Sequence, residues 1–519
     1  MMKRYPIGIQ TFSEVVEGKY QYVDKTGYVY NIANRYKYIF LSRPRRFGKS
    51  LLTSTFHSYF EGRQELFEGL EAGKLETEWT KYPVFHFDIS TAKHIDKENL
   101  IIELEGKLAQ YEKIYPRDTA HKNVNQWLEG LIQHAYEKTG NKVVVLIDEY
   151  DAPLLDVLSE DKSLEENRQV MRNFYSLLKS CDQYLRFVFI TGITKFSQLS
   201  IFSELNNLQN ISMMPQYAGI CGITTEELQT QFSDDIDDFA SRVNTSRKEV
   251  LKVLQEYYDG YHFSHISPDV YNPFSLIKAL DAGELNSYWF SSGTSTYLIE
   301  QMRHFGVLPQ EMCKLEAFED EFDAPTESMT SITPLLYQSG YLTIKGYSPD
   351  TMIYTLAIPN REVRAGLMKS MAAYVVADGV PTPFYRLIGD MQKAFIHDDM
   401  EQVMVCLKIF FSAIPQVDNV KKNPEGYYQS LLFVAFSMMC QYTDVEVRTP
   451  QGRADLVMNA RHKIYIIEVK IDKNADFAID QINLKDYGER FIIQGKPIVK
   501  VGVNFDSENT HNITDWKIL

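Results

Sequence analysis

The segment Arg43-Pro-Arg-Arg-Phe-Gly-Lys-Ser50 constrains the fold of this chain more than any other stretch. It follows a short apolar run, Tyr38–Leu41, and precedes a helical pattern that begins at Leu51. A strand, a tight loop and a helix that opens with Gly-Lys-Ser form a phosphate-binding loop, where backbone N–H groups and the positive helix end bind a polyphosphate. In such a loop Lys49 would reach the β- and γ-phosphates, and the Ser50 hydroxyl would hold Mg²⁺.

The loop departs from the general pattern at its first position, where Arg43 stands in place of glycine. Pro44 also removes one backbone donor. Gly-Lys-Ser is a common tripeptide, and a basic cluster is more often a solvated surface than a binding site. The loop alone therefore does not establish a nucleotide site.

Two further strand patterns support a nucleotide site. Val143–Ile147 has the pattern of a buried strand and is closed by Asp148 and Glu149. If this strand lies beside the strand of the loop, Asp148 would bind Mg²⁺ through water and Glu149 would activate the attacking water. The strand Arg186–Ile190 ends at Thr191, a polar tip suited to sensing a γ-phosphate. The combination predicts ATP binding. The residues expected to contact ATP are Arg46, Phe47, Gly48, Lys49, Ser50, Leu51, Asp148 and Thr191.

Alternation of strands and helices in the first part of the chain predicts an α/β fold with a doubly wound parallel sheet and ligands at the carboxyl ends of its strands. At 519 residues the chain is too long for one compact core. We expect an ATPase core over 1–222, a helical lid over 223–328, a winged-helix-like and helical connector over 329–420, and a separate domain over 421–519.

The last domain holds a second constellation of charged residues. Strand patterns cover 445–448, 453–458 and 464–470. Period-2 alternation places Glu468 and Lys470 on one face, where Asp455 of the neighbouring strand can meet Glu468 and hold a divalent cation. Lys470 would position or deprotonate a water and stabilise a phosphorane-like transition state. The pattern predicts a metal-dependent phosphodiesterase.

A surface hairpin with alternating charges would show the same pattern. Two observations favour a site. Glu468 stands at the end of a very apolar strand, where an unpaired carboxylate is costly to bury. Gln481, Lys485 and Tyr487 follow on a predicted helix, where they are expected to contact a nucleic-acid backbone.

Composition limits the class of protein. A net charge of −15 argues against a surface coated throughout with nucleic acid, although it leaves room for a local basic groove. The five cysteines are scattered and lack CxxC spacing, which indicates reduced thiols. The N-terminus lacks an apolar signal core and no apolar run reaches the length of a membrane span, so we expect a bacterial cytoplasmic protein without a membrane partner.

Several blocks together resemble the bacterial AAA-ATPase-like family, which is typically fused to a C-terminal PD-(D/E)XK nuclease domain with an α/β restriction-endonuclease-like fold. The matching blocks are Tyr22–Thr26, Arg43–Ser50, Ile147–Pro153, Thr191–Thr194, Gly452–Asp455, Glu468–Lys470, Gln481-Ile482 and Tyr487. An arginine at position 43 is normal for this family. The resemblance implies ATP binding at Lys49, Ser50 and Asp148, and a metal-nuclease site at Asp455, Glu468 and Lys470.

We therefore expect an ATP-controlled nuclease that uses Mg²⁺, or Mn²⁺ at the second site, on nucleic acid, DNA rather than RNA. Defence or maintenance of mobile DNA would suit it by analogy. The alternative is an ATP-dependent switch or scaffold whose nuclease-like domain binds nucleic acid or protein without cleaving. A small-molecule kinase would need an acceptor pocket that the sequence does not display. Arg172 and Lys195 are candidates for an arginine finger or its equivalent, and homo-oligomerisation is left open.

Overall fold

The computed structural model contains two compact units, Met1–Gln301 with Glu316–Asn360, and Met302–Leu315 with Arg361–Leu519. The predicted connector 329–420 therefore contributes residues to both units. The structure describes residues 4–519 except 92, 117–122, 159, 196–206, 292–295, 308–311, 313, 326–328, 376–381, 413–423, 440–443, 447–454, 461 and 486–494.

The first unit is built on a five-stranded parallel sheet in the order β2-β3-β4-β1-β5. Its strands are β1 (Tyr38–Ser42), β2 (Val84–Asp88), β3 (Val143–Asp148), β4 (Leu185–Gly192) and β5 (Gln209–Asn210). This confirms the predicted doubly wound sheet. The expectation that β3 lies beside β1 is wrong, because β4 lies between them and pairs with both.

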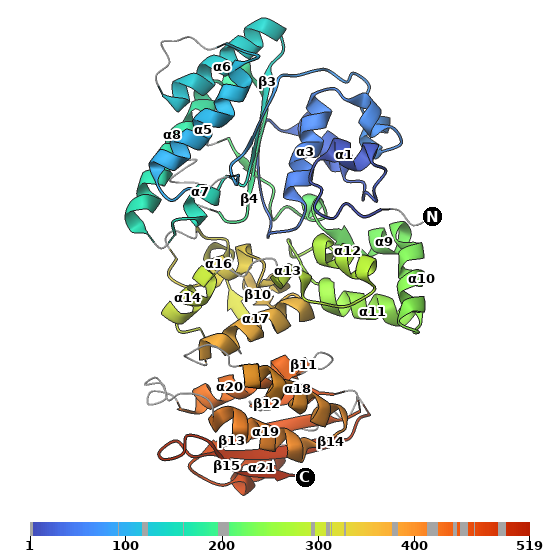
Figure 1. Cartoon of the computed structure of the whole chain (residues 1–519), viewed down its shortest axis with the longest axis vertical. Coiled ribbons are helices and arrows are strands. Elements are labelled where there is room, and N and C mark those ends of the chain that lie inside the picture. Colours follow the sequence, from blue (N-terminus) through green and yellow to red (C-terminus); the bar gives the residue numbers. More distant parts are fainter. Residues whose placement is uncertain are drawn as a thin grey trace. The chain divides into compact units, whose positions relative to one another are not determined.

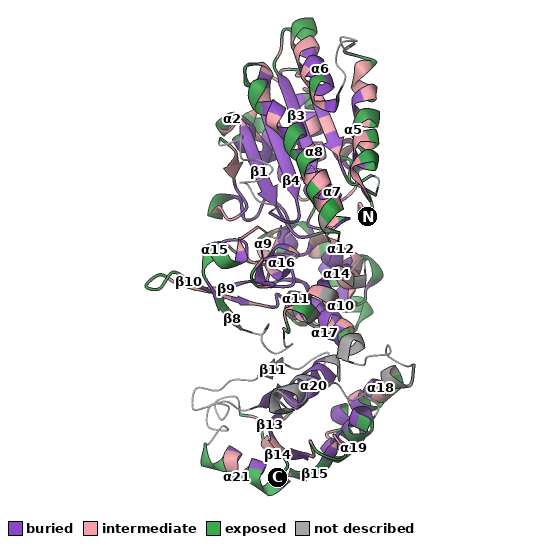
Figure 2. Ribbon diagram, turned by 90° about the vertical axis from the view of Figure 1, so that its left-hand side faces the viewer, coloured by how far each residue is buried: buried purple, intermediate pink, exposed green. Residues whose placement is uncertain are grey.

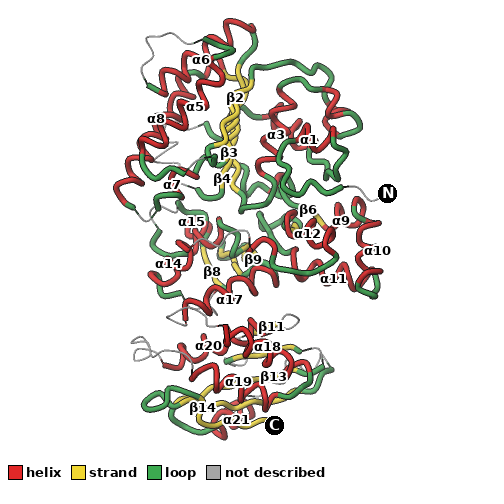
Figure 3. Tube along the Cα trace, viewed as in Figure 1, coloured by secondary structure: helices red, strands yellow, loops and turns green. Residues whose placement is uncertain are grey.

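Helices cover both faces of this sheet, which explains why β1 and β3 are buried along their whole length and apolar up to their last residue. One face carries α5 (Lys97–Glu112), α6 (Val124–Thr139) and α8 (Asp161–Ser180), and the other carries α1 (Phe12–Glu17) and α3 (Lys49–Phe60) (Figure 1). The tube in Figure 3 shows the strands as a single layer between these two groups. The carboxyl ends of β1, β2, β3 and β4 meet at one edge, where ligands bind in such folds.

A helical segment follows, as predicted for a lid. It comprises α9 (Thr225–Gln231), α10 (Ser233–Arg242), α11 (Arg247–Tyr258) and α12 (Pro273–Ala282), which pack around a core of their own. Thr224 and Glu227 form a capping box that begins α9. Further on, α16 (Thr333–Gln338) precedes the antiparallel pair β9 (Thr343–Ser348) and β10 (Ile353–Ala357), the predicted winged-helix-like arrangement.

The second unit contains a sheet whose five strands lie in chain order: β11 (Asp444–Glu446), β12 (Leu456–Asn459), β13 (Ile464–Ile471), β14 (Ile498–Phe505) and β15 (Ile513–Ile518). Only the β13–β14 pair is parallel, and α21 (Ala475–Leu484) connects its strands. This mixed sheet fits the predicted restriction-endonuclease-like domain. Its other helices include α17 (Arg361–Val375), α18 (Thr382–Ile396), α19 (Met400–Ser412) and α20 (Pro424–Met439).

Alternation along β13 assigns its side chains to two faces of this sheet. Ile466 packs in one cluster with Ile479 and Ile482 of α21, whereas the Tyr465 ring contacts the Phe395 ring of α18 at 5.4 Å. Glu468 therefore shares the face that α21 covers. In the described part of the whole chain, no helix combines the length and the apolar character needed to cross a membrane.

Candidate nucleotide and metal sites

The candidate phosphate-binding loop lies between β1 and α3, in the predicted order of strand, tight loop and helix. Gly48 caps the start of α3 with a φ of 91°, a left-handed value that favours glycine. Lys49 opens the helix and its side chain is buried. Its ammonium lies 3.4 Å from the Pro44 carbonyl oxygen and 3.4 Å from Oε1 of Glu149. The loop thus curls around Lys49 and brings it to the acidic residue after β3.

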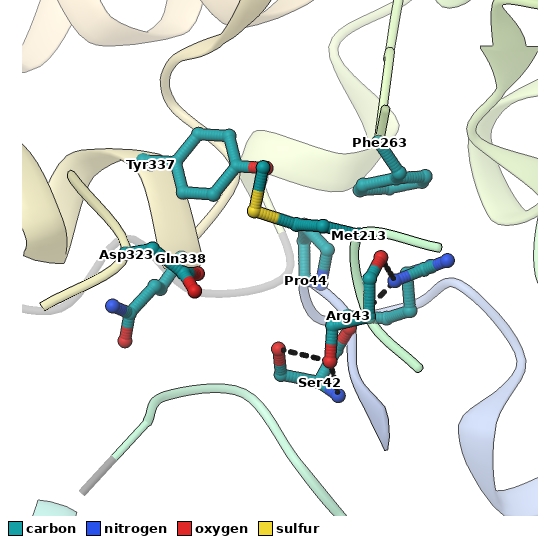
Figure 4. A pocket seen from close by; sticks show the side chains of 9 residues that line it. Ser42, Arg43, Pro44, Met213, Phe263, Asp323, Tyr337 and Gln338 are labelled. Carbon is teal, nitrogen blue, oxygen red and sulfur yellow. Dashed lines mark hydrogen bonds between the residues drawn. The ribbon is translucent and has the colours of Figure 1, made fainter. Parts of the chain in front are cut away.

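Arg43, which stands where the general pattern has glycine, directs its guanidinium to backbone carbonyl oxygens. Its Nη1 donates to the carbonyl oxygens of Ser42 at 2.9 Å and Ser212 at 2.7 Å, and its Nη2 donates to that of Tyr217 at 3.2 Å. The guanidinium carbon lies 4.1 Å from the centre of the Phe263 ring (Figure 4). Burial lowers the pKa of Arg43 to about 10. Arg43 ties the loop to the segment after β5, so its role here is structural.

The helical segment packs against the same loop. The Phe47 ring lies edge-on to Tyr261, with ring centres 4.8 Å apart, and the Arg46 guanidinium lies 4.9 Å from the centre of the Phe274 ring. The indole of Trp289, in the short helix α13 (Tyr288–Ser291), donates to the Arg45 carbonyl oxygen at 3.0 Å. Because the Phe47 ring is used in packing, Phe47 could offer a nucleotide only its backbone.

Asp148 and Ser50, the two expected Mg²⁺ ligands, are neighbours. Asp148 ends β3, is 2% exposed and accepts a hydrogen bond from Ser50. Burial raises the pKa of Asp148 to about 6, and the charge of Glu149 adds to the rise while the Ser50 hydrogen bond opposes it. A carboxylate and a hydroxyl are hard oxygen donors that fit Mg²⁺, and the cation would offset the cost of burying the Asp148 charge.

Glu149 has a φ of 52°, unusual for a residue other than glycine. Its backbone N–H donates to Oδ1 of Asp148 at 3.0 Å, and its carboxylate faces Lys49. Non-glycine residues with such backbone conformations concentrate at functional sites. The geometry brings together Lys49, Ser50, Asp148 and Glu149, as the sequence predicts.

Thr191 is placed differently. It is fully buried and its hydroxyl donates to the Leu41 carbonyl oxygen at 2.8 Å, inside the sheet. It could contact a γ-phosphate only by giving up that hydrogen bond. Of the two finger candidates, Lys195 is ion-paired with Asp323, and Arg172 is exposed on α8. Leu51 is partly buried in the first turn of α3.

Sequence reasoning missed two acidic residues at this edge. Asp88 ends β2 and lies opposite Asp148 in the strand register. Asp151 is fully buried, and its Oδ2 accepts hydrogen bonds from the backbone N–H groups of Ile193 and Thr194 at 3.0 and 2.7 Å. The closeness of Asp151 to Asp148-Glu149 in the sequence is a signal that could have pointed to it.

The second site is assembled across β12 and β13. Their antiparallel register pairs Leu456 with Ile467, and one further step places Asp455 opposite Glu468, on the same face of the sheet. The Asp455 backbone N–H donates to the Glu468 carboxylate, and Oδ2 of Asp455 accepts from the Val469 N–H at 2.6 Å. The two predicted acidic residues are therefore neighbours, joined by a hydrogen bond from the Asp455 backbone to the Glu468 side chain.

Glu468 is 1% exposed, and its Oε2 has no hydrogen-bond partner among the described residues. Its Oε1 accepts a hydrogen bond from Lys470 at 3.0 Å. Burial raises the pKa of Glu468, and the charge of Lys470 opposes the rise. An unpartnered buried carboxylate oxygen next to a second acidic residue is a site that a divalent cation would fill.

Gln429 of α20 is a residue that sequence reasoning missed. Its Nε2 donates to Oδ1 of Asp455 at 2.7 Å. Gln481 is partly buried on α21, and Lys485 is exposed just after it. Tyr487 lies outside the described residues. Within the described ranges, no three His, Cys, Asp or Glu side chains form a metal-binding group, so an ion at either site would also need hydroxyl, backbone or water ligands.

Comparison with known proteins finds a family match in each part of the chain that holds a candidate site. Residues 6–202 match the family model described as a predicted AAA-ATPase, and residues 423–516 match that of the PD-(D/E)XK nuclease superfamily. A protein of Azotobacter chroococcum mcd 1, described as an uncharacterized protein in the vnfD 5′ region, is 32% identical over 528 residues, which is 98% of this chain and 97% of the relative. The chain belongs to the family of AAA-ATPase-like proteins that carry a C-terminal domain of the PD-(D/E)XK nuclease superfamily.

Proposed function

We propose that this protein binds and hydrolyses ATP and thereby controls a Mg²⁺-dependent nuclease that cleaves phosphodiesters of nucleic acid. The observation that carries the proposal is the contact between Asp455 and Glu468, with Lys470 beside them and one Glu468 oxygen unpartnered. DNA is the expected substrate. Cytoplasmic defence or maintenance of mobile DNA would suit this activity.

In the first unit, each residue near the loop has a distinct task. The backbone N–H groups of residues 46–51 would bind the phosphates, and Lys49 would neutralise their charge. Ser50 and Asp148 would hold Mg²⁺, and Glu149 would orient and deprotonate the attacking water. The contact of Glu149 with Lys49 supports this arrangement, because the acid then lies beside the γ-phosphate position.

In the second unit, Asp455 and Glu468 would hold Mg²⁺ or Mn²⁺. The bound cation would polarise the scissile phosphate and activate a water. Lys470 would hold that water and stabilise negative charge as it develops on the phosphoryl oxygens. Gln481 and Lys485 would bind the nucleic-acid backbone, because they lie on and just after α21, the helix that covers the face carrying Glu468. The sequence alone proposes Tyr487 for the same role.

The test uses the full-length protein with plasmid DNA, linear DNA and RNA in the presence of Mg²⁺ or Mn²⁺. We expect cleavage by the native protein and none by Asp455→Ala. Asp390→Ala, which removes an exposed carboxylate on α18, is the matched control and should cleave normally. Cleavage by Asp455→Ala at the native rate would refute the site.

A switch or scaffold without cleavage is the second candidate. It is favoured by the ion pair between Lys470 and Glu468, which already neutralises part of the charge that a metal would offset. Absence of cleavage on every substrate, together with ATP binding that Lys49→Ala abolishes, would support this second function.

A further inference from the structure

Asp151 binds one side of the turn after β4. This turn is Ile193–Lys195, and we call it the coupling turn. Besides the two backbone N–H groups, the Thr194 hydroxyl donates to Oδ2 of Asp151 at 2.7 Å. Burial raises the pKa of Asp151, the charge of Glu149 adds to the rise, and Lys49 opposes it. Asp151 is therefore within electrostatic reach of the groups that would meet the phosphates.

Tyr150 and Gly192 strengthen the same connection. The Tyr150 N–H donates to the Thr191 carbonyl oxygen at 3.1 Å, and the Tyr150 hydroxyl donates to the Thr194 carbonyl oxygen at 2.9 Å. A Cβ added to Gly192 would lie 2.5 Å from Oδ1 of Asp151 and 2.6 Å from the Tyr150 ring. The segment after β3 and the coupling turn are in such close contact that a displacement of one must move the other.

On its other side the coupling turn is bound by residues 316–342, which we call the middle module. The Lys195 N–H donates to Oε1 of Gln338 at 2.7 Å, and its ammonium forms an ion pair with Asp323. The Gln338 Nε2 donates to the Ala324 carbonyl oxygen at 2.7 Å. The side chains of Lys195 and Asp323 are only 8% and 19% exposed, so separating them would leave a buried charge without its partner.

The phosphate-binding loop touches the middle module at a second point. Gly340 has a φ of 88°, and a Cβ added there would lie 2.7 Å from Cβ of Pro44. Between the two contacts lies a cavity of about 20 Å³, lined by Arg43, Pro44, Asp323, Tyr337 and Gln338 among others (Figure 4). This volume holds about one water. The loop and the middle module therefore have room for a small shift relative to each other.

We propose that the coupling turn transmits the nucleotide state of the phosphate site to the middle module, with Asp151 as the positioning residue and the Lys195–Asp323 pair as the output contact. Binding of a Mg²⁺-nucleotide changes the charge around Lys49, Asp148 and Glu149. Asp151 responds to that change and shifts the turn, and Lys195 carries the shift to Asp323 and Gln338. The inference rests on the proposed ATP binding and names the middle module, in the same unit, as the part that responds to it.

Hydrogen exchange of the full-length protein, with and without a non-hydrolysable ATP analogue and Mg²⁺, tests the proposal. Peptides from 316–325 and 332–342 should exchange more slowly with nucleotide in the native protein. Lys195→Met with Asp323→Asn removes both charges together and leaves no unpaired one, so this variant should fold. We expect it to bind the analogue as tightly as the native protein and to lose the response of the middle module.

The control is Glu227→Gln, at another ion pair. It removes the negative charge of the Lys25–Glu227 pair, whose side chains are 11% and 21% exposed and which also joins the N-terminal part to a later helix. This variant should keep the response. A native-sized response in the double variant, or an equal loss in Glu227→Gln, would overturn the proposal. If the native protein binds no nucleotide, the proposed function fails; if it binds and the middle module is unchanged, only this inference fails.

Discussion

The backbone N–H of Asp455 donates a hydrogen bond to the carboxylate of Glu468, so the chain itself brings the two acids of the second site together. Because one oxygen of Glu468 is buried without a partner in the described residues, the site carries an electrostatic cost that a cation would remove. This cost leads to predictions that separate metal binding from the chemical step.

Glu468→Gln and Lys470→Met should differ in their effect on metal. Glu468→Gln should abolish both Mn²⁺ binding and cleavage, since it removes a ligand charge. Lys470→Met should retain Mn²⁺ binding and slow cleavage by roughly 10²–10⁴-fold, the usual loss for a group that handles a proton in the transition state. Isothermal titration with Mn²⁺ and single-turnover cleavage check both effects. Equal loss of Mn²⁺ binding in the two variants would contradict the assigned roles.

Gln429→Leu should lower both the stability of the protein and the affinity of the second site for metal, although Gln429 is not a proposed metal ligand. The change removes the donor to Oδ1 of Asp455 and leaves a buried carboxylate oxygen short of one hydrogen bond. We expect the free energy of unfolding to fall by about 1–3 kcal/mol, with weaker Mn²⁺ binding. Gln402→Leu on the exposed side of α19 is the control and should change neither quantity. Urea denaturation and Mn²⁺ titration provide the measurements, and unaltered Mn²⁺ affinity in Gln429→Leu would argue against a positioning role.

Asp148→Asn should stabilise the metal-free protein, with a specific pH dependence. The pKa of Asp148 is raised from 3.8 to about 6, so the folded state bears the cost of the buried charge above that pH. The gain should be roughly 1–3 kcal/mol near pH 8 and should shrink as the pH falls below about 6. It should vanish below the unfolded pKa of 3.8, where the native carboxyl is protonated in both the folded and the unfolded state. Thermal unfolding across this range tests the prediction.

Asp182→Asn is a control for the Asp148→Asn experiment, and its effect on stability should have the opposite sign. Its hydrogen bond with Lys37 lowers the pKa of Asp182, so the charge stabilises the folded state above the unfolded pKa. Removing it should lower the melting temperature at neutral pH, and the difference should disappear in acid. The same direction of change in both variants would show that burial does not decide the behaviour of Asp148.

Arg43→Gly restores the general phosphate-loop pattern but should harm the protein. Its guanidinium donates to three backbone carbonyl oxygens, which would lose a buried partner. We expect a loss of roughly 2–5 kcal/mol in unfolding free energy and no gain in ATP affinity. Arg45→Gly, at an exposed side chain of the same loop, should be close to neutral in stability. Tighter ATP binding by Arg43→Gly would show that Arg43 restricts the site instead of supporting it.

Local pattern in the sequence was sufficient for the elements and for the main candidate residues. The apolar runs that predict β1, β3 and β4 are buried strands, because a strand covered on both faces must be apolar along its length. The alternation that places Glu468 and Lys470 on one face follows from strand geometry, which depends only on neighbouring residues. Lys49, Ser50, Asp148 and Glu149 meet because they lie at or beyond the carboxyl ends of two such strands, β1 and β3.

Only the tertiary structure decided how distant segments pair. In the folded chain β4 lies between β1 and β3, and the Thr191 hydroxyl donates to the Leu41 carbonyl oxygen. Arg43 is buried against carbonyl groups far along the chain, and Gln429 donates to Asp455. Periodicity reports which side of an element is buried, but it carries no information on which other segment covers that side. That choice depends on the packing of the whole chain, so the buried hydrogen-bond partners at both sites became visible only in three dimensions.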